Sequence, residues 1–462
     1  MKNTIFGLLG SLLLGAPAVA QDQFDYTTNA DNSLTITRYS GTNAAVTIPS
    51  TIDGLSVTAI GDFAFYESYG LTDITIPDSV VTIGDSAFEE CSRLTLVILT
   101  NGIVSIGNSA FNNCFNLSAI SIPATVSIIG QEALNGCSSL PEIAVDVSSS
   151  FYCSSNGVLF DKNLTTLVQF PSGMMGSYAI PSSVTNIIPF AFSGAYGLTS
   201  VTIPGSINCI NDYSFRGCYG LTNATVMSGV SNIGEQAFFD CPNLMKFTIP
   251  LGVTNIGHSA FEYCSSLSSL IIPGSVVTIG TAACSACGSL ANVVIGEGVT
   301  TIDSSAFYDC SALLNITMPT TVSSISGFAF FGCDNLNGVY FEGDAPILGE
   351  SVFKGNYVDY PTIYYLPGTD GWASFATNTD APTVLWDPLI QTGDGNLGVR
   401  NNQFGFDITG TADIPIVVEA CTNLGNPIWV ALQSLALTNG LFYFGDPQWT
   451  NYSARYYRIS SP

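Results

Sequence analysis

Residues 71–94 read LTDITIPDSVVTIGDSAFEECSRL, and residues 94–117 read LTLVILTNGIVSIGNSAFNNCFNL. The second stretch repeats the first after 23 residues, with the glycine, the Ala-Phe pair, the cysteine and the final leucine in the same places. Self-similarity at a short fixed period is the signature of a solenoid, in which each unit packs only against its neighbours. The period therefore predicts an elongated stack of rungs rather than one compact core.

The cysteines mark how far the repeat extends. Within each of two series, they advance in steps of 23 residues: Cys91, Cys114 and Cys137, and then Cys218, Cys241, Cys264, Cys287, Cys310 and Cys333. Ser68 and Ala195 take the cysteine position in their own rungs, so the position requires a small side chain. We place the solenoid at residues 46–345.

Each part of a rung has a physical role. Ile74 and Ile76 alternate with polar residues, which is the pattern of a half-buried strand, and Pro77 ends that strand because it cannot donate to the ladder. Residues 81–84 predict a second short strand that ends at a glycine corner. Residues 87–91 predict one helical turn with alanine, phenylalanine and cysteine facing the interior.

The unit Ile-Pro-x-x-Val-x-x-Ile-Gly-x-x-Ala-Phe-x-x-Cys-x-x-Leu resembles the BspA-like leucine-rich repeats of secreted bacterial and some protist surface proteins. The resemblance implies a mainly β, right-handed leucine-rich-repeat solenoid of 23-residue units. Related proteins are surface adhesins and interaction proteins, so it also implies a binding scaffold without catalysis. Fold alone does not fix function, and this step is an analogy.

The segments outside the regular repeat have other characters. Residues 21–45 predict an N-terminal β cap, and residues 346–386, where prolines gather, predict a C-terminal cap. The irregular stretch at about 146–180 resembles a hairpin-like variant rung of the family, and we expect a tolerated insertion or a functional bulge there. Residues 387–462 predict a small β-sandwich, which resembles a C-terminal module of secreted bacterial proteins; surface attachment is a hypothesis for it.

The first 20 residues have the pattern of a secretory signal peptide. Lys2 precedes an apolar run from residue 5 to residue 14, and Ala18-Val19-Ala20 supplies a small-x-small cleavage site. The apolar run is too short to span a bilayer, and no later segment predicts a membrane span. We expect cleavage after Ala20 and a secreted or cell-surface location.

Charge excludes some partners. The chain carries 35 acidic against 10 basic residues, a net charge of −25, which repels nucleic acid phosphates and anionic lipid. We therefore expect an extracellular protein or glycan partner, and no nucleic acid.

Candidate chemical sites are few. The nine in-register cysteines predict a reduced, buried ladder, and Cys284-Ser285-Ala286-Cys287 is an accidental redox spacing because Cys287 belongs to that ladder. His258, the only histidine, predicts a solvated turn residue and supports no catalytic triad. The acidic residues at the corners are interpreted as solvated side chains. The alternative is that their carboxylates bind calcium. No catalytic, cofactor or metal site is predicted, and the repeat-only sequence disfavours a polysaccharide-processing enzyme.

The outward positions of the main strand are the candidate binding face. They are nearly uncharged and rich in threonine, serine and asparagine, and a solvated surface and a flat contact surface explain them equally well. The candidate residues are Ser200, Thr202, Asn223, Thr225, Lys246, Thr248, Asn292, Asn315, Thr317 and Tyr340. The leading prediction is an adhesin-like scaffold; the alternative is a structural envelope or extracellular-matrix component that self-associates.

Overall fold

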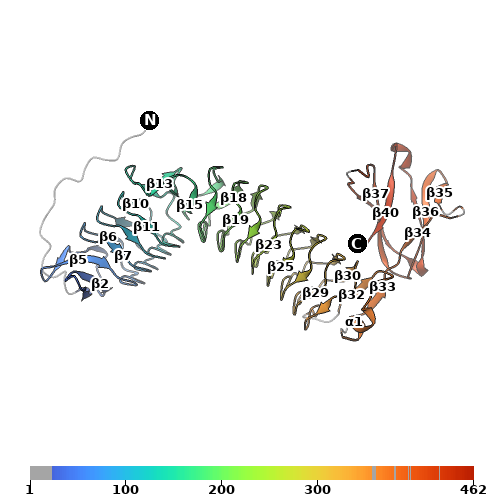
Figure 1. Ribbon diagram of the computed structural model, residues 1–462, viewed down its shortest axis with the longest axis horizontal. Coiled ribbons are helices and arrows are strands. Elements are labelled where there is room, and N and C mark those ends of the chain that lie inside the picture. The colour runs from blue at the N-terminus through green and yellow to red at the C-terminus, as the bar shows by residue number, and fades with distance from the viewer. Residues whose placement is uncertain (1–22, 356–359, 379–380, 394, 396, 426) are drawn as a thin grey trace. The chain divides into compact units, whose positions relative to one another are not determined.

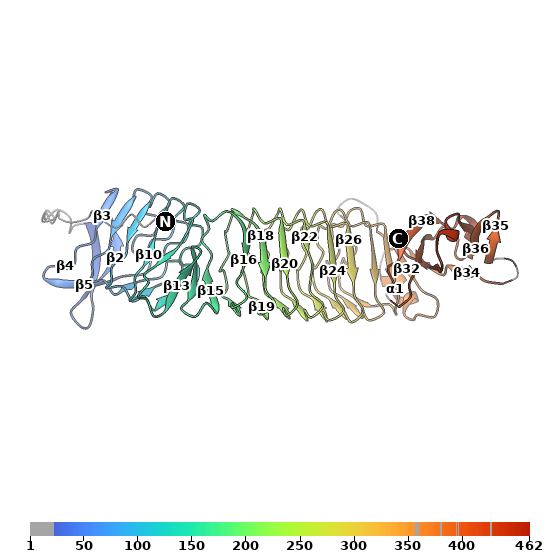
Figure 2. The same cartoon turned by 90° about the horizontal axis from the view of Figure 1, so that it is seen from above.

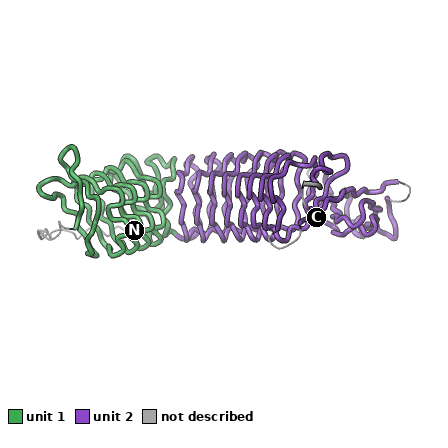
Figure 3. The backbone as a smooth tube through the Cα atoms, turned by 90° about the horizontal axis from the view of Figure 1, so that it is seen from below, with its two compact units in different colours: residues 1–174 green, residues 175–462 purple. Residues whose placement is uncertain are grey.

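A computed structural model describes residues 23–355, 360–378, 381–393, 395, 397–425 and 427–462. The predicted signal peptide lies outside these residues. The chain forms two compact units, Met1–Met174 and Met175–Pro462 (Figure 3). No helix among the described residues is long and apolar enough to cross a membrane.

The first unit begins with a hairpin and continues as a stack of rungs. Strands β1 and β2 pair antiparallel, and β2 then pairs in parallel with β5 of the first rung. One sheet contains β1 (Phe24–Thr28), β2 (Leu34–Tyr39), β4 (Thr51–Ile52), β5 (Leu55–Ile60), β7 (Thr82–Ile83), β9 (Ser105–Ile106) and β11 (Ile128–Ile129). The other rung strands are β3 (Ala45–Thr47), β6 (Asp73–Thr75), β8 (Leu96–Ile98), β10 (Ser121–Ile122) and β12 (Ala144–Val145).

The irregular stretch contributes an antiparallel meander to the first unit. It consists of β13 (Tyr152–Ser155), β14 (Val158–Asp161) and β15 (Thr166–Gln169). Val158, Leu159 and Phe160 are fully buried. The meander is therefore part of the core of this unit.

The second unit repeats the rung more regularly, with two ladders of parallel strands (Figures 1 and 2). The first, called the face ladder here, contains β16 (Gly176–Ala179), β18 (Leu198–Ile203), β20 (Asn223–Val226), β22 (Lys246–Phe247), β24 (Ser269–Ile272), β26 (Asn292–Ile295), β28 (Asn315–Met318), β30 (Gly338–Phe341), β32 (Thr362–Tyr365) and β33 (Thr383–Leu385). The second contains β19 (Cys209–Ile210), β21 (Asn232–Ile233), β23 (Asn255–Ile256), β25 (Thr278–Ile279), β27 (Thr301–Ile302), β29 (Ser324–Ile325) and β31 (Ile347–Leu348), with β17 (Asn186–Ile187) beside β19.

The predicted helical turn is wrong. Gln236 and Asp240 have φ of 49° and 54°, in the left-handed region that a right-handed helix excludes. Their N–H groups, and that of Phe238 between them, each donate to a carbonyl of the next rung at 2.8 Å. The segment is therefore a series of turns whose backbone N–H groups donate to the neighbouring rung. In an α-helix, the same N–H groups would donate to carbonyls within the helix. The only α-helix among the described residues is α1 (Trp372–Asn378).

Stacked phenylalanine rings fill the core of the second unit. Phe215 lies 4.6 Å from Phe192 and 5.0 Å from Phe238, measured between ring centroids, and Phe261 follows at 5.5 Å. All four rings are fully buried. The cysteine of each rung lies beside this column, and the Sγ of Cys241 donates to the carbonyl of Phe215 at 3.2 Å.

The C-terminal module, residues 387–462, contains two antiparallel sheets. Its elements are β34 (Leu389–Gln391), β35 (Leu397–Arg400), β36 (Gln403–Thr409), β37 (Pro415–Cys421), β38 (Val430–Ala436), β39 (Leu441–Asp446) and β40 (Tyr456–Ser460), with 3₁₀ turns at Thr438–Gly440 and Trp449–Asn451. One sheet joins β34, β35 and β39 to the central β36, and the other has the order β38-β37-β40. A shared core that includes Phe406, Ile416 and Phe444 makes this a sandwich, as predicted.

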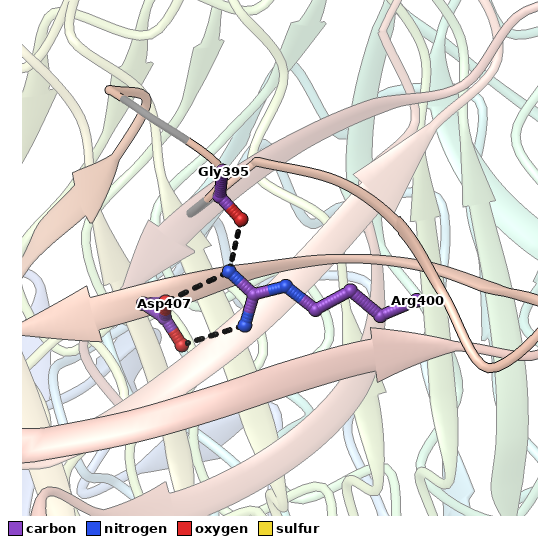
Figure 4. A network of polar contacts seen from close by, with 3 residues as sticks. All are labelled: Gly395, Arg400 and Asp407. Atoms are coloured by element: carbon purple, nitrogen blue, oxygen red, sulfur yellow. Dashed lines mark hydrogen bonds and ion pairs between the residues drawn. The ribbon is translucent and has the colours of Figure 1, made fainter.

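Ion pairs supplement the core of the module. The guanidinium of Arg400 bonds both carboxylate oxygens of Asp407, at 3.1 and 3.5 Å, and also the carbonyl oxygen of Gly395 (Figure 4). It also lies 4.8 Å from the centroid of the Tyr443 ring. This contact fixes the β35–β36 hairpin at the surface.

Candidate binding surface

The outward side chains of the face ladder form two straight columns because the rungs pair in register. Asn223 lies opposite Ser200 on one side and Lys246 on the other, and Thr225 lies opposite Thr202. The inward positions between them are buried, as Ala224 shows at 3% exposure. Strand alternation thus places one outward residue of each type at every rung.

The structure places nine of the ten candidate residues on strands of this ladder, and Thr248 follows directly after β22. Asn223, Thr225, Lys246, Thr248 and Asn292 are exposed, whereas Ser200, Thr202, Asn315 and Thr317 are half-buried. Tyr340 is different, at 4% exposure.

The C-terminal cap covers Tyr340, and the C-terminal module reaches the rung before it. The Tyr340 ring stacks on Tyr364 at 4.6 Å, and its edge meets Trp386 at 6.1 Å. The hydroxyl oxygens of Thr317 and Ser461 lie 2.9 Å apart, which ties the strand face to the C-terminal end of the chain. The freely accessible part of the face therefore ends before β30.

Two apolar residues interrupt the polar columns. Ile271 and Val294 occupy the column of Thr225 and are 61% and 55% exposed. A groove of about 620 Å³ passes Val294 and Asn315 and reaches Glu342 and the C-terminal Pro462. The face therefore combines polar and apolar contacts, as protein and glycan contact surfaces do.

A second cleft, of about 360 Å³, continues from this groove between the face ladder and the module. Both concavities include Thr317 and Glu342. Its lining comprises Thr317, Tyr340, Phe341, Glu342, Tyr364, Leu366, Trp386, Glu419, Arg458, Ile459, Ser460 and Ser461. We call this space the module cleft.

Charges of both signs lie in the module cleft. The Nε of Arg458 donates to the Oε2 of Glu419 at 2.6 Å, and its guanidinium lies 4.5 Å from the centroid of the Trp429 ring. Partial burial and the nearby carboxylate of Glu297 raise the pKa of Glu342, while Arg458 lowers it. A single cation is thus shared between carboxylates from the solenoid and from the module.

The cysteine ladder is closed to solvent. Its nine members are buried, as predicted. Burial raises the pKa of Cys91 and of Cys137 to about 12, so these thiols stay protonated at neutral pH and are poor nucleophiles. Cys284 is 1% exposed and its pKa is likewise raised to about 12 by burial, which disfavours a redox role for it and Cys287.

His258 is exposed, as predicted. Its Nδ1 lies 3.1 Å from the carbonyl oxygen of Thr281, and its Nε2 lies 3.3 Å from the hydroxyl of Ser259. Ser259 is 1% exposed and therefore inaccessible to a substrate.

The acidic corners bind backbone groups. The Oδ1 of Asp62 accepts from the N–H of Asp85 at 2.8 Å, and that of Asp85 accepts from the N–H of Asn108 at 2.7 Å. Within the described part of the chain, no group of three or more His, Cys, Asp or Glu residues could hold a metal ion.

Sequence reasoning missed the module cleft. Glu342, Glu419 and Arg458 lie in three separate segments, and no spacing links them. One signal was present, because Tyr340 and Tyr364 put two consecutive aromatic rings at outward positions that carry no aromatic ring in the earlier rungs of this ladder. That change in side-chain size marks where the face is covered.

A solved leucine-rich repeat structure shares this fold. A leucine-rich repeat protein from Eubacterium ventriosum is 24% identical, with a TM-score of 0.51 over 74% of this chain and 95% of that chain. A leucine rich cell surface protein from Faecalibacterium prausnitzii is 26% identical, with a TM-score of 0.42 over 62% of this chain and 95% of that chain. No curated protein matches.

The repeat itself matches a known family profile. The BspA type leucine rich repeat region matches residues 58–175, 169–287 and 231–359, which cover more than half of the chain. The 23-residue register, the buried cysteine column and the turn segments that bond from rung to rung are the physical form of that repeat. The chain belongs to the BspA-type leucine-rich repeat family.

Proposed function

We propose that this protein is an extracellular, cell-surface or secreted scaffold that binds a protein or glycan through its face ladder and has no catalytic activity. The observation that carries the proposal is the accessible stretch from Asn223 to Asn292. Its outward residues are exposed, and few are charged.

The energetics of such a surface favour binding to an extended partner. Each rung offers the same small area, so affinity comes from many weak contacts at regular intervals rather than from one deep pocket. Exposed apolar groups such as Ile271 and Val294 supply area whose burial stabilises a complex, at about 25 cal/mol per Å² before the costs of association. Few charges must be desolvated.

Two features support the extracellular position. The N-terminal 20 residues have the order of charge, apolar run and small residues of an export signal. The resemblance to the BspA-like repeat family, whose members are surface and secreted proteins, implies the same location.

The test uses the full mature chain and two double variants. Thr225→Arg with Thr248→Arg adds bulk and charge to the face, whereas Thr254→Arg with Thr281→Arg makes the same change at exposed positions of other parts of the rung. Each is immobilised and exposed to purified extracellular-matrix proteins and to a glycan array. We expect saturable capture by the unchanged chain and by the second variant, and loss by the first.

Equal capture by both variants would move the site away from the face ladder. Absence of any capture, with oligomers that grow with concentration in analytical ultracentrifugation, would favour the self-associating structural role instead.

A further inference from the structure

The module cleft differs chemically from the open face. The open face presents short hydroxyl and amide side chains at regular intervals, whereas the cleft combines aromatic rings, carboxylates and one guanidinium. It is formed by β28, β30 and β32 of the face ladder and by β37 and β40 of the module. Its groups therefore come together only when both parts are folded.

Hydrogen-bonding capacity in the cleft is incompletely used. Arg458 engages Glu419 through Nε, and Glu419 accepts through Oε2. Within the described residues, the terminal amino groups of Arg458 and the Oε1 of Glu419 have no hydrogen-bond partner, and neither does the carboxylate of Glu342. A guanidinium fork beside carboxylate acceptors suits a ligand whose neighbouring groups both donate and accept.

The charges restrict the ligand. Glu297, Glu342 and Glu419 outnumber Arg458, so an anionic ligand such as a phosphate or a uronic acid is repelled. A strongly cationic ligand would meet the positive charge of Arg458, which already occupies the carboxylate of Glu419. A neutral ligand with several hydroxyl groups meets neither penalty.

Aromatic rings supply the apolar contact. Tyr364 and Trp386 are half-buried in the cleft wall, and the stacked Tyr340 holds Tyr364 in place. Trp386 is fixed in turn, because its Nε1 donates to the carbonyl of Pro415 at 2.9 Å. Rigid aromatic groups offer large contact areas at little cost in conformational entropy, and the C–H faces of sugar rings pack well on them.

We propose that the module cleft binds a neutral oligosaccharide, or a neutral segment of a polysaccharide, that continues along the groove past Asn315 and Val294. The Arg458 guanidinium donates to sugar hydroxyls, the carboxylates of Glu342 and Glu419 accept from them, and the aromatic wall contacts the ring face. This assignment deepens the proposed binding function and rests on it.

The experiment titrates the full mature chain with short neutral oligosaccharides from β-glucan, mannan and galactan, and with oligogalacturonate as the acidic probe. Tryptophan fluorescence reports occupancy, because Trp386 lies in the cleft and Trp429 lies beside Arg458, two of the four tryptophans in the chain. Calorimetry gives the affinity. We expect at least one neutral probe to bind and the acidic probe not to bind.

Two cleft variants and one control variant locate the site. Glu342→Gln and Arg458→Gln should each weaken binding of the neutral probe about tenfold, since each removes a charge-assisted hydrogen bond. The Thr254→Arg, Thr281→Arg chain, which is changed outside the cleft and the face ladder, should bind the probe unchanged. Near-UV circular dichroism and melting temperature confirm that each variant is folded.

The outcomes separate this inference from the proposed function. No binding of any neutral probe, binding of the acidic probe alone, or equal binding by the cleft variants would overturn the cleft assignment. Loss of macromolecular capture on the face variant would stand independently of those results. Preferential binding of a basic peptide to the cleft would also overturn the sugar assignment.

Discussion

The rungs of the second unit and the C-terminal module are built on opposite principles. A rung bonds only to its neighbours: the N–H of Phe238 donates to Ala260 in the next rung, and the Sγ of Cys241 donates to Phe215 in the previous one. In the module, longer antiparallel strands bring distant segments together, and Val418 pairs with Ile459. Repetition stabilises the first region, whereas a single closed core stabilises the second.

Charges are distributed in the same unequal way. The three ion pairs found among the described residues all lie in the module, at Arg400, Arg455 and Arg458. The rungs instead rely on apolar columns and on hydrogen bonds, including those that the corner carboxylates accept from backbone N–H groups. The comparison teaches that the two regions should respond differently to pH and to single substitutions.

Alkaline pH is expected to have the largest effect on the rungs. Burial raises the pKa of Cys91, Cys137 and Cys333 from 9.0 to about 12. Unfolded thiols ionise above pH 9 while the folded ones stay neutral, so the free energy of unfolding is unaffected below about pH 9. It then falls as the pH rises toward 12, by about 1.4 kcal/mol per thiol per pH unit. Urea unfolding followed by circular dichroism at neutral and alkaline pH measures this slope.

The control for the pH experiment is Cys333→Ala, which removes one buried thiol. Its free energy of unfolding should fall less steeply with pH above 9. Identical slopes in the two proteins would show that the thiol does not titrate as described.

Removing one ring from the phenylalanine column should have the next largest effect. Phe238→Ala leaves a cavity between Phe215 and Phe261 and should lower the free energy of unfolding by about 3–5 kcal/mol. Thermal and urea unfolding measure the change. The adjacent Phe239→Ala, at a half-buried ring, should cost about 1 kcal/mol or less. Equal losses would mean that the column is not the principal core.

Asp446→Asn tests whether the module is a separate folding unit. Asp446 is 4% exposed, lies 2.8 Å from Arg455, and accepts from the hydroxyl of Tyr457 at 2.8 Å. Losing its charge leaves Arg455 buried without compensation, at a cost of about 3 kcal/mol. Hydrogen exchange should show reduced protection in β36 to β40 and unchanged protection in the rungs before β28. A uniform loss along the whole chain would contradict separate folding.

Arg400→Gln should have the smallest effect. The Arg400 side chain is 37% exposed, and ion pairs at such positions contribute about 1 kcal/mol or less. The midpoint of thermal unfolding should barely move. The part of its salt dependence that comes from this ion pair should disappear. A large shift would indicate that the β35–β36 hairpin holds the module together.

Most of the rung follows from the sequence, because a 23-residue period leaves few ways to bury the same columns. Ile83, Phe88 and Cys91 are buried as the repeat predicts. The turn segment did not follow, since Ala-Phe-x-x-Cys has helical spacing. What decides its conformation is hydrogen bonding to the next rung, with Ser86 and Glu90 at φ of 53° and 61°. That partner is supplied by stacking and is absent from any single rung.

The candidate surface was predictable only in part. Alternation identified the outward positions, and Asn223, Thr225 and Lys246 are exposed there. The burial of Tyr340 depends on Tyr364 and Trp386 of the C-terminal cap, and the position of Arg458 near Glu342 depends on where the module docks. Docking is a property of the assembled unit, and one outward tyrosine in a repeat pattern does not reveal it.

The bonds between neighbouring rungs have an evolutionary consequence. Because ladder partners are offset by 23 residues, as Asn232 and Asn255 are, a tandem duplication of 23 codons can add a complete rung whose partners already exist. Each addition lengthens the stack by about 4.8 Å, the spacing between paired strands. The length of the solenoid can therefore change during evolution by whole rungs, while the module at its end stays the same.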